Sequence, residues 1–182
     1  MASQPKPHSF DTWNIPDFAR VRDRMIDRKL TQGPSFTLKD LLIAHAAKCV
    51  ALKREKDEVH YSAWSLMNDI VEANASGERY SFLDLWHRYN EGEFPGGYGP
   101  MKALTTELEI VSGVCEAYGL PLLSMLVVDN GTRELSPAAM KAFWEDPRRK
   151  SDLVVAHSKE EFAQQMTALA RNVTKADLDA LV

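Results

Sequence analysis

Five hydroxyl residues, each directly in front of apolar residues at helical spacing, divide this chain of 182 residues into short helical segments. A Ser or Thr side chain in that position accepts a hydrogen bond from the backbone N–H groups that open a helix. The five candidate caps are Thr37, Ser62, Ser136, Ser158 and Thr174. The repeated pattern predicts a protein built mostly of helices.

Apolar residues at helical spacing predict eight helices. They are expected at about 16–30, 38–58, 63–76, 82–89, 101–118, 137–144, 159–172 and 175–181. Pro16 suits the first turn of the first helix, and Gly33-Pro34 ends that segment. The sequence EGEFPGGYGP, residues 91–100, holds four glycines and two prolines and is the clearest loop.

The centre of the chain also carries a strand-like pattern. Residues 122–128, LLSMLVV, are predicted to form a strand, and Arg133 to Leu135 a short returning strand. Asn130-Gly131 between them is typical of a tight hairpin turn. A further brief strand is expected at 78–81. The predicted fold is therefore α+β, mostly helical, with an N-terminal arm and helical layer at 1–77, a β-hairpin module at 78–136 and a C-terminal helical segment at 137–182, together forming one unit.

The order of elements in residues 78–135 resembles a winged helix, in which a β-hairpin covers a pair of helices. The stretch from Glu78-Arg79-Tyr80-Ser81-Phe82 to Asn130-Gly131 resembles the winged-helix half of alkyltransferase-like proteins. That family carries a cysteine nucleophile in a Pro-Cys-His-Arg motif, whereas residues 127–131 contain no cysteine. The resemblance thus implies a winged-helix centre without alkyl transfer. The sequence LPLLSMLVVDNGTRELSP also resembles uncharacterised bacterial and phage-borne proteins.

The charge balance disfavours broad contact with nucleic acid. The formal net charge is −4, and residues 78–136 hold four basic against nine acidic side chains. Proteins that bind nucleic acid gain much of their affinity by neutralising its phosphates. A recognition helix at 101–118 that carries Lys102 against Glu107, Glu109 and Glu116 does not suit a major groove.

Two clusters of basic residues could bind an anionic partner. Arg20, Arg24 and Arg28 recur every fourth residue and share one helix face, away from its apolar stripe. Arg148, Arg149 and Lys150 form a second cluster in a loop. Guanidinium groups suit carboxylates and phosphates. The alternative for both clusters is an ordinary solvated surface.

No set of catalytic or metal-ligating residues stands out. His45 and Cys49 are four residues apart on one predicted helix, which suits two metal ligands, but a site needs two more. His87 lies among aromatic residues without a recognisable nucleophile. Gly96 to Pro100 precedes a helix yet lacks the lysine and Ser/Thr of a phosphate-binding loop. We therefore expect neither a cofactor nor a metal, and two reduced cysteines.

The sequence favours a non-enzymatic binding or regulatory protein of a bacterium or mobile element, acting through protein contacts, with DNA contact left open. The alternative is an acidic immunity- or antitoxin-like inhibitor of a basic effector, and the third hypothesis is a small enzyme. No apolar run reaches the roughly 18 residues of a membrane span, and the N-terminus lacks the apolar core of a signal peptide. These features indicate a cytoplasmic protein with no membrane contact. They leave its oligomeric state open.

Overall fold

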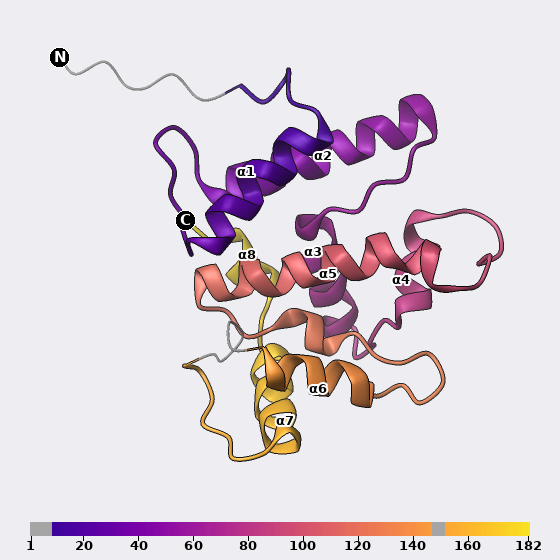
Figure 1. Ribbon diagram of the computed structural model, residues 1–182, viewed down its shortest axis with the longest axis vertical. Helices are drawn as coiled ribbons and strands as arrows, with labels where there is room; N and C mark the ends of the chain where they lie inside the picture. Colours follow the sequence, from indigo (N-terminus) through magenta and orange to yellow (C-terminus); the bar gives the residue numbers. More distant parts are fainter. Residues whose placement is uncertain (1–8, 147–151) are drawn as a thin grey trace.

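Helix α5 (Tyr98–Tyr118) crosses the middle of the fold, and the other helices pack around it in layers (Figure 1). The computed structural model describes residues 9–146 and 152–182. The N-terminal layer consists of α1 (Ile15–Asp27) and α2 (Leu38–Lys56). The central layer adds α3 (Ala63–Ala75) and α4 (Phe82–Tyr89) to α5. The C-terminal part holds α6 (Pro137–Glu145), α7 (Lys159–Ala170) and α8 (Lys175–Asp179).

The helix caps confirm the helical part of the prediction. The side chains of Thr37, Ser62, Ser136, Ser158 and Thr174 each accept a hydrogen bond from the backbone N–H three residues later. Asn14 and Ser81 act in the same way at α1 and α4. The ends differ by a few residues from the prediction: α1 stops at Asp27 and α5 begins at Tyr98.

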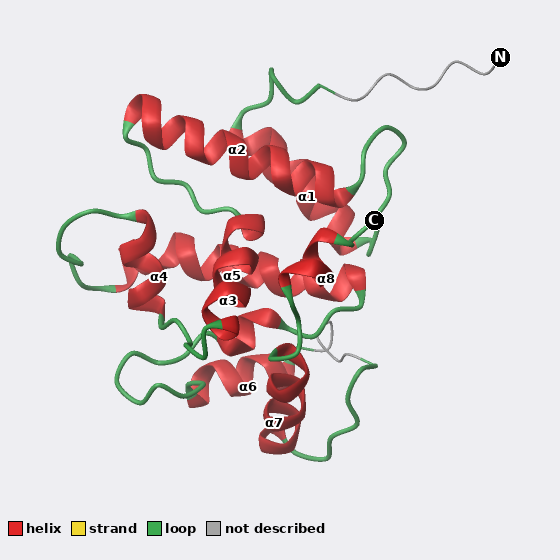
Figure 2. Ribbon diagram, turned by 180° about the vertical axis from the view of Figure 1, so that it is seen from behind, coloured by secondary structure: helices red, strands yellow, loops and turns green. Residues whose placement is uncertain are grey.

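The predicted β-hairpin and the α+β, winged-helix-like centre are wrong. Within the described residues the structure has helices and loops and no sheet (Figure 2). Residues Leu123–Leu126 form one 3-10 turn, η1, and Arg133 has a φ of 57° that an extended strand does not allow. The brief strand expected at 78–81 is reduced to an isolated parallel bridge between Ser81 and Val128.

Burial explains why residues 122–128 do not form the strand of a hairpin. All seven are buried, in a place where η1 is packed among α3, α5 and α7. A two-stranded hairpin exposes every second side chain on one of its faces. A short continuous apolar run fits a fully buried segment of any conformation, and the surrounding helices decided which one formed.

A turn still forms where the sequence predicted one. The Asp129 carboxylate accepts hydrogen bonds from the backbone N–H groups of Gly131 and Thr132 at 2.9 and 3.0 Å. The Asp129 N–H donates to the carbonyl oxygen of Glu134 at 2.8 Å. The turn therefore closes on itself and needs no paired strands on either side.

Helices α1 and α5 approach each other closely at one glycine. A Cβ atom placed on Gly113 would lie 2.5 Å from Cγ2 of Ile26, so only glycine fits there without a shift. No helix among the described residues is both long and apolar enough to cross a membrane.

We predict that Gly113→Ala lowers the free energy of unfolding by about 1–3 kcal/mol, because the added methyl group pushes against Ile26. This loss outweighs the gain of about 1 kcal/mol that alanine brings to a helix interior. Urea unfolding measures the effect. Gly99→Ala, in the first turn of the same helix with no atom within 4 Å of its Cβ position, is the control and leaves stability unchanged or slightly raised. Equal behaviour of the two variants would contradict the close approach.

Candidate functional site

A buried ion pair joins three helices at the centre of the fold. Arg22 of α1 donates from Nη1 to Glu107 Oε1 of α5 at 2.8 Å. The same oxygen accepts the backbone N–H of Ala63, the first residue of α3, at 2.7 Å. Arg22 and Glu107 are only 5% and 8% exposed. One carboxylate oxygen therefore holds α1 and the N-terminus of α3 against α5.

Neither Arg22 nor Glu107 was predicted to be buried, although each lies on an apolar stripe. Arg22 falls four residues after Phe18 and three before Met25, and both of these are buried. Glu107 lies between Leu104 and Val111 on the buried side of α5 in the same way. A charged residue in register with an apolar stripe was the signal that could have indicated the burial of each residue, although not the identity of its partner.

Burial raises the pKa of Glu107, while the Arg22 guanidinium and the Ala63 N–H act in the opposite direction. The arginine also donates from Nε to Asp23 at 2.9 Å. No described residue hydrogen-bonds to Arg22 Nη2 or to Glu107 Oε2. Each side chain of the pair thus retains one polar atom that makes no hydrogen bond with the described residues.

His45 of α2 is buried close to this pair. Its ring stacks on Phe18 with 5.4 Å between the ring centroids. The residue is 3% exposed, and neither ring nitrogen has a hydrogen-bond partner among the described residues. Burial, with smaller contributions from Arg22 and His60, lowers the pKa of His45 to about 4. The imidazole is therefore neutral at pH 7.

These groups line a hollow of about 440 Å³ between α1, α2 and α5, which we call the His45 hollow. Its polar lining is made of Arg22, His45, His60, Tyr61, Lys102, Thr106 and Glu107, and the rest of its lining is Ile15, Ala19, Val59, Gly99 and Ala103. A concave site with apolar walls and a few polar groups is the usual form of a small-molecule pocket.

The predicted arginines of α1 lie at the surface. Arg20, Arg24 and Arg28 are all exposed, and we call them the arginine row. Arg20 pairs with Asp17 at 2.9 Å, while the side chains of Arg24 and Arg28 have no ion pair within the described residues. The sequence of residues 16–30 has five basic and three acidic side chains, and because Arg22 is buried only four of the basic ones lie at the surface. The second predicted cluster, Arg148, Arg149 and Lys150, lies outside the described residues.

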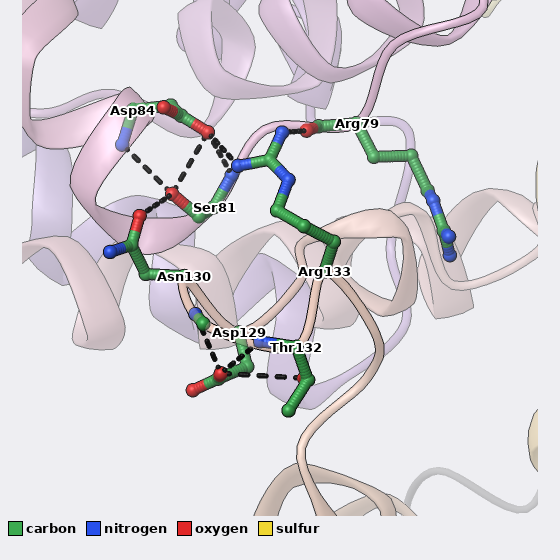
Figure 3. A network of polar contacts seen from close by, with 8 residues as sticks. Arg79, Ser81, Asp84, Asp129, Asn130, Thr132 and Arg133 are labelled. Carbon is green, nitrogen blue, oxygen red and sulfur yellow. Dashed lines mark hydrogen bonds and ion pairs between the residues drawn. The ribbon is translucent and has the colours of Figure 1, made fainter.

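A second, open hollow of about 630 Å³ lies beside α4. Figure 3 shows its wall, where Arg133 donates to Asp84 Oδ2 at 2.6 Å and to the carbonyl oxygen of Arg79 at 2.5 Å. Ser81 bonds to Asp84 and, at 3.2 Å, to Asn130, which ties the turn at 129–133 to the start of α4. On the other side Arg88 pairs with Asp69 at 2.8 Å. Arg133 and Arg88, two of the cations that line this hollow, are therefore already paired with carboxylates. The hollow is for this reason a weaker candidate for binding anions.

The remaining sequence candidates do not come together. Cys49 is buried and its Sγ contacts the carbonyl oxygen of Tyr61, and burial raises the pKa of both cysteine thiols to about 12. In the described part of the chain no three His, Cys, Asp or Glu side chains gather closely enough to hold a metal ion. His87 is exposed beside the α4 hollow, and Gly97 is the N-cap residue of α5.

Comparisons with protein-family models, with curated proteins and with solved structures gave no match for this chain. Two features that the fold brings together are candidates for binding: the exposed arginine row of α1, and the His45 hollow beneath the same helix.

Removing the charge of Glu107 tests the buried ion pair. We expect Glu107→Gln to lower the free energy of unfolding by about 3 kcal/mol, because the Arg22 guanidinium then stays buried without a counterion. Chemical denaturation measures the loss. Glu109→Gln, on the exposed side of the same helix, is the matched control and changes stability by less than about 0.5 kcal/mol. A Glu107→Gln variant as stable as its control would show that the pair is not structurally important.

His45 makes the protein sensitive to mild acid. Its pKa is about 4 when folded and near 6.5 when unfolded, so the unfolded chain takes up the proton first and stability falls as the pH drops from 7 to 5. The expected loss from this group is about 2 kcal/mol. Denaturation at several pH values measures this loss as a decrease in the free energy of unfolding with falling pH. We expect His45→Phe to remove this slope. His87→Phe, at an exposed histidine, keeps the slope because His45 is intact. An unchanged slope in His45→Phe would contradict the assignment.

Proposed function

We propose that this chain is a non-enzymatic binding or regulatory protein that contacts an acidic protein partner through the arginine row. The observation that carries the proposal is the state of Arg24 and Arg28, which are exposed and have no ion pair among the described residues. Other arginines of the fold, such as Arg22, Arg88 and Arg133, already bind carboxylates of the chain itself. Guanidinium groups without an internal partner are available to carboxylates of another molecule.

The neighbouring helix favours a protein over a nucleic acid. Helix α2 packs on α1 and exposes Ile43 and Val50, which are 42% and 65% exposed, with exposed Ala47 between them. Protein interfaces combine apolar residues with arginines, whereas nucleic-acid interfaces need a strong basic surplus. The net charge of −4 and the small surplus on α1 fit the first description better.

One observation supports the alternative, an inhibitor that covers a basic effector. Asp27, Glu109, Glu116 and Asp146 surround a hollow of about 210 Å³ between the end of α1 and α5, with Lys29 as its basic residue. An acidic surface of this kind suits a basic partner. The two proposals differ in the sign of the charge that the partner must carry.

Reversing the arginine row tests the first proposal. The probe is poly-L-glutamate immobilised for interferometry at low salt, and the variant is Arg20→Glu/Arg24→Glu/Arg28→Glu. We expect the wild-type chain to bind the probe and the variant to bind at least tenfold more weakly, because Arg24 and Arg28 are exposed guanidinium groups without an ion pair among the described residues. Two further probes are measured in the same way: a DNA duplex tests for a nucleic-acid partner, and poly-L-lysine tests for a basic partner.

The matched control carries the same change of charge elsewhere: Lys141→Glu/Lys159→Glu/Arg171→Glu, at three exposed positions of the C-terminal helices. It should bind poly-L-glutamate within threefold of the wild type. Equal losses in both variants would show that binding follows net charge alone. Binding to poly-L-lysine in place of poly-L-glutamate, abolished by Glu109→Lys, would favour the inhibitor. Circular dichroism confirms that each variant is folded.

A further inference from the structure

We infer that the His45 hollow binds a small organic carboxylate, a monoanion whose head group lies between Arg22 and Lys102 and whose apolar part lies against α1 and the segment before α3. This site is separate from the arginine row, since Arg22 is buried and takes no part in that surface. The inference does not depend on the proposed function.

The charges that line the hollow select a monoanion. The Arg22 guanidinium is balanced by Glu107 and Asp23, yet its Nη2 has no hydrogen-bond partner in residues 9–146 and 152–182. Lys102 is exposed at the rim and has no ion pair within the described part of the chain. His45 is uncharged at neutral pH because of its burial. One unmatched cation beside a buried carboxylate suits a singly charged ligand and disfavours a phosphate dianion or a polyanion.

The side chain of His45 is an independent sign of a ligand. A buried polar group without a hydrogen bond costs about 1–3 kcal/mol, and native structures rarely leave one unsatisfied without a reason. Both ring nitrogens of His45 are in this state, although the residue lines the hollow. A half-turn of the ring about Cβ–Cγ exchanges its nitrogen and carbon positions without changing its shape. Because His45 is among the lining residues, we place one ring N–H toward the hollow after this exchange, where a carboxylate oxygen would accept it.

The rest of the lining suits an apolar body. Ile15 and Ala19 of α1, Val59 before α3, and Ala103 of α5 form the apolar walls. The volume of about 440 Å³ lies in the range of ordinary ligand pockets and leaves room for an aromatic or branched carbon skeleton. Benzoate and hexanoate represent these two shapes, and benzamide has the shape of benzoate without its charge.

Titration calorimetry of the full chain with these three compounds tests the inference. We expect saturable one-to-one binding of at least one of the two acids and at least tenfold weaker binding of benzamide. In ¹H–¹⁵N spectra of the imidazole rings the signal of His45, assigned by its loss in His45→Phe, should shift on saturation with the acid. His87 and His157, which are exposed and do not line the hollow, provide the reference signals.

Lys102→Met separates a specific site from general attraction, because Lys102 is exposed and its loss leaves the core intact. It should weaken binding of the acid about tenfold, whereas Lys141→Met, at an exposed lysine of α6, should leave it unchanged. Three results would overturn the inference: no saturable binding of either acid, equal affinity for benzoate and benzamide, or equal effects of the two lysine variants. None of them bears on poly-L-glutamate binding by the arginine row.

Discussion

The fold depends on the carboxylate of Glu107, whose Oε1 receives hydrogen bonds from two other helices at once. Arg22 reaches it from α1, and the first backbone N–H of α3 reaches it from the other side. A buried ion pair adds little net stability compared with apolar side chains of the same size. Its effect here is on register, because only one placement of α1 and α3 on α5 satisfies both donors.

The close approach at Gly113 belongs to the same arrangement. Arg22 meets Glu107 and, one turn further along α1, Ile26 meets Gly113. The order of these contacts is the same on both helices, so α1 and α5 run in roughly the same direction, as Figure 1 shows. The missing side chain at Gly113 allows the helices to lie near enough for the ion pair to close.

Helix α1 carries arginines on two of its sides, one of them buried and the others exposed. Its buried arginine is used by the core and by the His45 hollow, while Arg20 and Arg24 point to solvent, and Arg28 caps the helix end. Burial decides between these roles, since a desolvated guanidinium requires a counterion and an exposed one does not. The arginine row and the His45 hollow are therefore two different surfaces of one helix.

The sequence by itself determined the local structure. Capping side chains such as Thr37, Ser62 and Ser158 stand within three residues of the groups that they bond, so their positions alone marked where helices begin. Tertiary structure decided the rest. The run Leu122–Val128 is apolar except for Ser124, and only the packing of α3, α5 and α7 around it made Leu123–Leu126 a 3-10 turn. Arg22 and Glu107 are 85 residues apart in the chain, and their pairing depends on how α1 lies on α5. No local pattern contains that information, because it comes from contacts between segments distant in sequence.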